Sequence, residues 1–160
     1  MAKDKHYYPV PLIAQANSKC CWFACYQMIY GWKKGRRASD VAPKLAKAGI
    51  STNDALDISQ WGRCASHLGM KGMRVSYIKG KANFDNMVDV LDRWGPMWCA
   101  GDFLNGSPHA ILISGWSRSS KTLRFIDPYK LWRGNTHSDY GHTYWSALIK
   151  NSKFACQQVA

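Results

Sequence analysis

The sequence is poor in acidic residues, in long apolar runs and in paired metal-binding cysteines. It has 10 Asp and Glu residues against 22 Lys and Arg residues, which gives a net charge of +12. Such a charge suits a solvated, soluble surface, and it also suits an acidic partner. No nucleic-acid-binding motif accompanies the charge, so nucleic acid is a disfavoured partner. The two favoured interpretations are a plain solvated surface and an acidic protein partner, and nucleic acid is the secondary one.

No apolar run approaches the roughly 20 residues that a membrane-spanning helix needs. Residues 1–9 contain no hydrophobic signal segment. We therefore expect no membrane partner and no export by the general secretory route. A dedicated secretion machine, or release from a longer precursor, leaves no such mark in a sequence.

The cysteines do not form the spacing patterns of a disulfide framework or a zinc site. No Cys-x-x-Cys pair exists, and no two histidines stand at helical ligand spacing, so we predict no structural metal and no cofactor. Without a secretory signal, free thiols are favoured over disulfides. The six cysteines are Cys20, Cys21, Cys25, Cys64, Cys99 and Cys156.

The composition belongs to a folded protein, with 46% apolar residues, eight Trp and eight Tyr in 160 residues. This length predicts one domain over residues 1–160. The pattern changes near Gly95-Pro96: helical periodicity dominates about 15–95, and strand-like runs dominate about 96–150. The predicted fold class is therefore α+β, with a helical half packed against an antiparallel sheet half.

Individual elements follow from periodicity, prolines and capping residues. Residues 8–14 are expected to be extended because of their two prolines. The expected helices cover 21–32, 39–48, 53–68 and 83–94. The expected strands cover 73–78, 97–103, 109–116, 122–127 and 144–149.

The most informative residue is Cys21, at the predicted N-terminus of the first helix. A helix N-terminus and a nearby imidazolium both stabilise a thiolate, so this thiol is placed to act as a nucleophile. Cys20 is the alternative nucleophile, but Trp22 and the spacing from Gln15 favour Cys21. Taken alone, a buried structural thiol would be the better interpretation. Cys25, one turn further on, is expected to lie in the core.

His109 is the best partner for the thiol, because it begins a rigid apolar strand after a loop that can line a cleft. Asp127 ends the next strand-like run, so a hairpin would bring both residues to the same end of adjacent strands. A carboxylate there fixes the tautomer and orientation of the imidazole. Asp102 is the alternative carboxylate. The other histidines are expected to be surface or packing residues; they are His6, His67, His137 and His142.

Acyl transfer also generates an oxyanion. The backbone N–H of Cys21 and the side-chain amide of Gln15 can both donate hydrogen bonds to it. A neutral amide is suited to this role because it donates without changing its charge.

At these residues the chain resembles the papain-like cysteine peptidases. The shared features are Gln15 six residues before Cys21-Trp22, then His109, then Asp127-Pro128. Asp-Pro at this place is similar to the compact bacterial branches, which include bacteriocin-leader peptidases and effector peptidases that bacteria inject into other cells. The stretches 10–13, 95–98 and 109–116 also resemble the effector branch.

Two features depart from the family pattern. Lys19-Cys20 replaces the usual Gly-Ser before the nucleophile. The interval from Cys21 to His109 is 88 residues, whereas in plant and lysosomal papains it is about 130–150. Substrate preference therefore does not transfer from the family.

The resemblance implies a cysteine endopeptidase, acting as a bacterial toxin or effector on a specific protein in the target-cell cytoplasm after delivery by a dedicated secretion system. It also implies a cognate immunity protein, whose acidic surface would suit the charge of +12. The alternatives are a peptidoglycan amidase, a protein deamidase or transglutaminase, and a basic binding domain without enzymatic activity.

Overall fold

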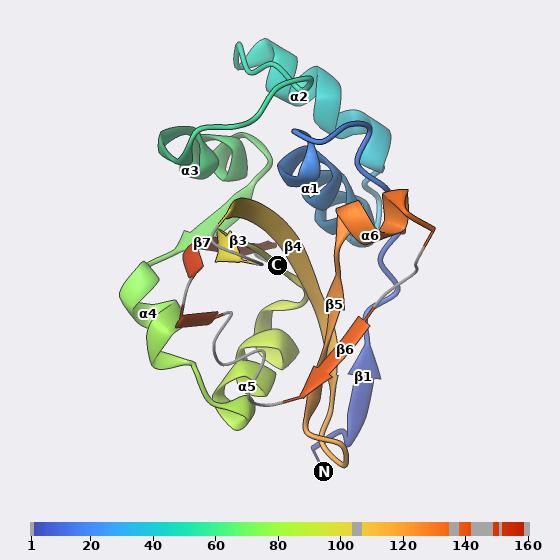
Figure 1. Ribbon diagram of the computed structural model, residues 1–160, viewed down its shortest axis with the longest axis vertical. Helices are drawn as coiled ribbons and strands as arrows, with labels where there is room; N and C mark the ends of the chain where they lie inside the picture. The colour runs from blue at the N-terminus through green and yellow to red at the C-terminus, as the bar shows by residue number, and fades with distance from the viewer. Residues whose placement is uncertain (1, 104–106, 135–137, 142–148, 151, 159–160) are drawn as a thin grey trace.

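The computed structural model describes residues 2–103, 107–134, 138–141, 149–150 and 152–158. Helices fill much of the first part of the chain, and strands fill most of the second (Figure 1). The strands are β1 (Lys5–Tyr7), β2 (Met70–Met73), β3 (Met97–Phe103), β4 (Ser107–Ser117), β5 (Thr122–Ile126), β6 (Ser138–Gly141) and β7 (Ser152–Gln158). The helices are α1 (Cys21–Trp32), the 3-10 turn η1 (Ala38–Asp40), α2 (Val41–Lys47), α3 (Ile58–His67), α4 (Val75–Gly80), α5 (Phe84–Trp94) and α6 (Pro128–Trp132).

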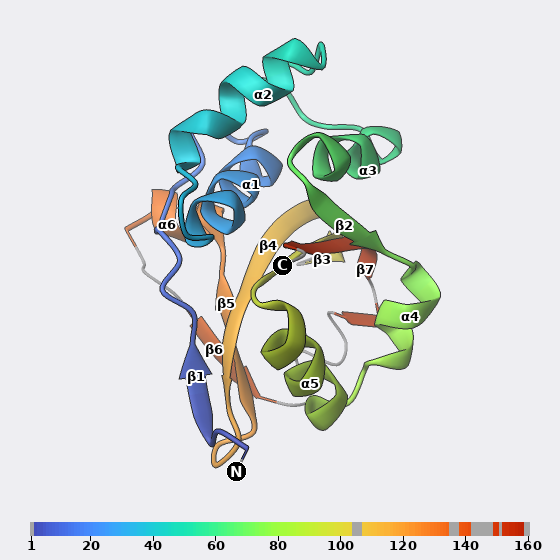
Figure 2. The ribbon, with the colours of Figure 1, turned by 180° about the vertical axis from the view of Figure 1, so that it is seen from behind.

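One antiparallel sheet carries the described strands in the order β2-β7-β3-β4-β5-β6, and β1 adds to the end of β4. The C-terminal strand β7 lies between β2 and β3 and pairs with both. Helices α1, α2 and α3 gather above the sheet, and α4 and α5 lie below it, in both views (Figure 1 and Figure 2). The α+β class predicted from the sequence is confirmed.

Apolar cores cover both faces of the central strands. The first core packs α1, α2 and α3 against alternate strand residues such as Trp98 and Ala100. The second packs α5 against the intervening residues such as Met97 and Cys99. Burial of both faces explains why β3 and β4 are almost continuously apolar rather than alternating.

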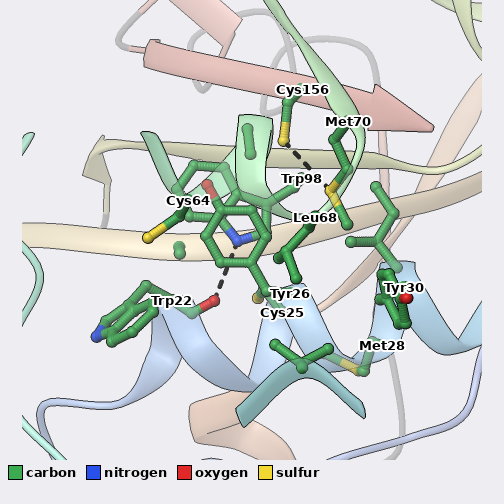
Figure 3. Packing of buried hydrophobic residues seen from close by; sticks show 14 of the residues in the cluster. Trp22, Cys25, Tyr26, Met28, Tyr30, Cys64, Leu68, Met70, Trp98 and Cys156 are labelled. Carbon is green, nitrogen blue, oxygen red and sulfur yellow. Dashed lines mark hydrogen bonds between the residues drawn. The ribbon is translucent and has the colours of Figure 1, made fainter. Parts of the chain in front are cut away.

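Helix α1 is fixed to the sheet through its first turns (Figure 3). Trp98 donates from Nε1 to the carbonyl oxygen of Trp22 at 3.1 Å, and its ring stacks on Tyr26 with centroids 4.6 Å apart. Both rings are almost fully buried. These buried contacts therefore hold the N-terminus of α1, where the site lies, in a fixed position against the sheet.

Several boundaries match the expectations from sequence. Helix α1 and strand β3 span the predicted residues, and β4 and β5 form the predicted hairpin. Gly49 and Gly69, which follow α2 and α3, adopt the left-handed conformation that is common where helices end, with φ of 73° and 69°. Asn83 caps α5 by accepting from the Asn86 N–H at 2.9 Å.

Three expectations were wrong or fall outside the described residues. Residues 73–78 are not a strand, because β2 ends at Met73 and α4 follows with Ile78 turned into the core. The helix expected from residue 53 begins only at Ile58, where Asp57 caps it. Most of the expected strand 144–149 lies outside the described part, whereas β7 was not foreseen.

No helix within the described ranges is long and apolar enough to cross a bilayer. In the same part of the chain, no group of three or more His, Cys, Asp or Glu side chains is placed to bind a metal ion.

Candidate active site

The site is assembled where the N-terminus of α1 meets the ends of β4 and β5. Cys21 is the first residue of α1 and is partly exposed. His109 lies near the start of β4, and Asp127 directly follows β5. The structure thus brings together three side chains that the sequence separates by up to 106 positions.

His109 and Asp127 form a close, shielded pair. Nε2 of His109 lies 2.7 Å from Oδ1 of Asp127, and the two side chains are 14% and 8% exposed. Since this contact occupies Nε2, Nδ1 is the ring nitrogen that remains for Cys21. The hairpin of β4 and β5 places both residues at one end of adjacent strands, as predicted.

The surroundings of His109 favour its protonated form. Burial alone lowers the pKa of this imidazole, but hydrogen bonds to Asp127 and Cys21 and their charges outweigh burial and raise it to about 9. Burial likewise raises the pKa of Asp127, yet the hydrogen bond and charge of His109 bring it below its usual value. At neutral pH the pair is therefore an imidazolium beside a carboxylate.

Asp127 has a second structural task. The same Oδ1 accepts from the backbone N–H of Tyr129 at 2.9 Å, which caps the short helix α6. Pro128 occupies the first helical position, where its lack of an N–H is tolerated. The start of α6 is also tied to the N-terminal segment, because Gln15 donates its backbone N–H to Pro128 O at 3.2 Å.

Gln15 is 3% exposed and lies in the segment that leads to the nucleophile. Its Nε2 donates one hydrogen bond to Asn17 O at 2.7 Å. An amide nitrogen carries two hydrogens, so one remains to donate elsewhere. Asn17 was not singled out from the sequence. Asn side chains often form turns by bonding the backbone two residues further on. Here Oδ1 of Asn17 accepts from the Lys19 N–H at 2.8 Å.

The alternative residues occupy other places. Cys20 is 2% exposed, and its Sγ donates to Thr52 O at 3.2 Å. Asp102 pairs with Lys153 at 2.5 Å instead of with a histidine. Cys25 is fully buried in the first core, as expected.

The remaining histidines do not reach this site in the described ranges. His6 packs its ring against Tyr8 and Trp116, and His67 is exposed at the end of α3. His137 and His142 lie outside the described residues.

A partly exposed thiol at a helix N-terminus, facing an imidazole that a buried carboxylate orients, defines a cysteine protease of papain-like fold. The chain belongs to the family described as papain-like cysteine protease AvrRpt2, whose model matches residues 4–144. The resemblance seen in the sequence is thereby confirmed, and the protein is a hydrolase of this class.

Solved structures support the fold assignment. A double glycine motif protease from an AMS/PCAT transporter, solved with its leader peptide, has 18% identity and a TM-score of 0.57, covering 95% of this chain and 91% of that one. The peptidase domain of Streptococcus ComA, a bi-functional ABC transporter in a quorum-sensing pathway, has 14% identity and a TM-score of 0.61, covering 96% and 100%.

A C39-like peptidase described as putative, from Bacillus anthracis, has 13% identity and a TM-score of 0.60, covering 99% of this chain and 98% of that one. Identities this low establish the common fold alone. No curated protein sequence matches the chain.

The His109–Asp127 pair leads to a pH prediction. In Asp127→Asn the imidazolium loses a buried charge-assisted hydrogen bond worth about 1.5–3 kcal/mol, so kcat/KM should fall about 10- to 100-fold. We expect the protonated imidazole to be the active form, so that wild-type activity declines only as pH rises through about 9. In the variant the pKa of His109 falls, and the alkaline limb of the kcat/KM profile should move to lower pH.

The matched control for this measurement is Asp102→Asn. The Asp102 carboxylate lies on β3 near the start of β4, and it pairs with Lys153. The alkaline limb of this variant should coincide with that of the wild type. An unshifted limb in Asp127→Asn would show that this carboxylate does not set the protonation of His109.

Proposed function

We propose that the protein is a cysteine endopeptidase that acts as a bacterial toxin or effector and cleaves a specific protein inside the target cell. Cys21, His109 and Asp127 form its catalytic triad. The observation that carries this proposal is the 2.7 Å contact between His109 and Asp127 beside the thiol at the N-terminus of α1. Asp127 stays ionised there and keeps the imidazole oriented.

In the proposed mechanism the thiol proton of Cys21 resides on Nδ1 of His109, and the thiolate attacks the peptide carbonyl carbon. The carbonyl oxygen becomes an oxyanion, which the backbone N–H of Cys21 and the second N–H of the Gln15 amide bind. His109 then returns its proton to the leaving amine as the C–N bond breaks. Water, deprotonated by His109, attacks the thioester and releases the acid product and Cys21.

The oxyanion role of Gln15 leads to its own prediction. Removal of one oxyanion donor typically costs about 10²- to 10³-fold in kcat, so Gln15→Ala should lower kcat by this amount and leave KM within about threefold. Steady-state kinetics on a cleaved peptide measure both constants. Ser18→Ala is the control, because Ser18 lies in the same segment with its side chain exposed. A Gln15→Ala effect confined to KM would contradict the assignment.

The toxin role and the delivery route rest on the sequence resemblance and on the charge of +12. We propose delivery into the target-cell cytoplasm by a dedicated secretion system, and an immunity protein in the producing cell whose acidic surface covers the cleft. Association steered by opposite charges slows as salt screens them. An association rate independent of ionic strength would remove the electrostatic part of this proposal.

The function is tested by expressing wild type and Cys21→Ala in the bacterial cytosol and periplasm, with proteomic detection of new N-termini. Toxicity in the cytosol together with new N-termini, both lost in Cys21→Ala, is expected. Toxicity confined to the periplasm would indicate a peptidoglycan amidase. A mass gain of about 1 Da on an intact protein would indicate a deamidase. Toxicity of Cys21→Ala equal to that of the wild type would indicate a binding domain without enzymatic activity.

A further inference from the structure

The segment that was expected to begin a helix at residue 53 instead lies along the nucleophile. Cys20 donates from Sγ to Thr52 O at 3.2 Å, and Trp22 donates from Nε1 to Asp54 O at 2.9 Å. These two donors stand immediately before and after Cys21. The 52–54 segment therefore runs beside residues 20–22 for its whole length.

A third contact completes the pattern. Asn17 donates from Nδ2 to Asn53 O at 3.4 Å, so three consecutive carbonyl oxygens accept from side chains in the loop before Cys21 and in the first turn of α1. The side chain of Asn53 stays exposed while its carbonyl is used. Binding through the backbone leaves the exposed Asn53 side chain able to contact another chain.

Cys20 is unusual among the three donors because of its position in α1. It is the N-cap residue, yet its side chain makes no capping hydrogen bond. Ser, Thr, Asp or Asn at an N-cap typically bonds back to the first helical N–H groups. The Cys20 side chain donates to Thr52 O instead, and a serine hydroxyl, which has one donor and two acceptor sites, can make this bond as well.

The thiol is suited to donate. Burial raises the pKa of Cys20, although the Asn17 side chain acts in the opposite direction, so the S–H proton is retained at neutral pH. The side chain is 2% exposed, and solvent does not compete for it.

We propose that Cys20 is a positioning residue: its S–H···O bond to Thr52 fixes the 52–54 segment as one wall of the cleft, against which the substrate chain lies beside Cys21. This inference rests on the proposed peptidase function. It assigns a role to the Lys19-Cys20 departure from the family pattern, and it places substrate contacts on a loop that lacks regular secondary structure.

The experiment compares Cys20→Ala, Cys20→Ser and Cys64→Ala with the wild type. Cys64 is the control because it is a fully buried thiol of the first core and makes no contact with the 52–54 segment among the hydrogen bonds described above. The substrate is the fastest-cleaved member of a library of internally quenched peptides. Loss of a hydrogen bond worth about 1 kcal/mol corresponds to about a fivefold effect.

For Cys20→Ala we expect KM to rise about fivefold with kcat within twofold, whereas Cys20→Ser, which keeps a donor, and Cys64→Ala should stay near wild type. In Cys20→Ala, iodoacetamide should alkylate Cys21 at the wild-type rate, because so small a reagent does not bind against the 52–54 segment. A Cys20→Ala variant with unchanged KM, or a Ser variant as impaired as the Ala variant, would overturn the proposal.

A second measurement requires no substrate. The indole N–H of Trp22 donates to Asp54 O, so its hydrogen exchange, followed by NMR, should accelerate about fivefold in Cys20→Ala. The Trp98 indole, which donates to Trp22 O in the core, should keep its rate. Equal acceleration of both would indicate general destabilisation and would overturn the proposal.

The two proposals fail in different ways. Peptide cleavage that persists in Cys21→Ala, or a wild type that cleaves no peptide, would remove the peptidase function. Neither result would alter the exchange rate of the Trp22 indole, which reports on the 52–54 segment alone.

Discussion

Cys21→Ala should lower kcat/KM by at least about 10⁴-fold, because in the proposed triad, which acts as a unit, no other group can replace the nucleophile. The loss should appear in kcat, since the variant keeps the side chains around residue 21 that would bind substrate. It is measured by progress curves on a cleaved peptide, with intact mass spectrometry to exclude slow turnover by contaminating protease. The variant should fold normally, because Cys21 is only partly buried.

The matched control is Cys25→Ala, one turn further along α1. Its thiol is fully buried, so the substitution removes a sulfur from the same helix without touching the reacting atoms. Activity should stay within a few-fold of wild type, and stability should fall modestly. Substantial activity in Cys21→Ala would exclude every mechanism proposed above, and loss in both variants would point to helix disruption instead.

His109→Ala should have the next largest effect, a fall in kcat of about 10³-fold or more. The imidazole is needed twice, first to take the thiol proton and then to protonate the leaving amine, and its pKa of about 9 lets it remain charged beside the thiolate. Alkylation of Cys21 by iodoacetamide at pH 6 should slow by about 10²-fold, because the thiolate loses its counterion. This second measurement is independent of any substrate.

His67→Ala is the control for His109→Ala, since His67 is exposed at the end of α3. It should change neither activity nor alkylation. If His109→Ala alkylates at the wild-type rate, His109 does not stabilise the thiolate, and its role in the site must be limited to later proton transfer.

The chemistry of the site could be predicted from sequence because it depends on order along the chain and on one hairpin. Two apolar runs joined by a short turn fix the pairing of β4 and β5, and the pairing carries His109 and Asp127 to the same end. The choice of Cys21 over Cys20 followed from the neighbouring Trp22 and from the spacing to Gln15. In the structure Cys20 is buried and donates to Thr52, whereas Cys21 is partly exposed.

The start of α3 and the strand β7 could not be predicted, because they depend on tertiary contacts that leave only weak signals in the local sequence. Asn53, Asp54 and Asp57 are all good N-cap residues, and the contacts of Cys20 and Trp22 with the 52–54 segment, invisible in the sequence, keep the first two out of the helix. Strand β7 was missed because it buries polar residues. Gln157 is 3% exposed, and its amide donates to Gly95 O at 2.8 Å.

The position of β7 between β2 and β3 has a consequence for folding and for when activity appears. Strand β2 follows the region that carries the 52–54 segment, and β3 pairs with the strand that carries His109. Strand β7 thus joins β2 to the strands that lead to His109 and Asp127. Pairings so distant along the chain form late in folding. A chain in which β7 has not yet paired therefore lacks the strand between β2 and β3, and we expect full activity only once β7 is in place.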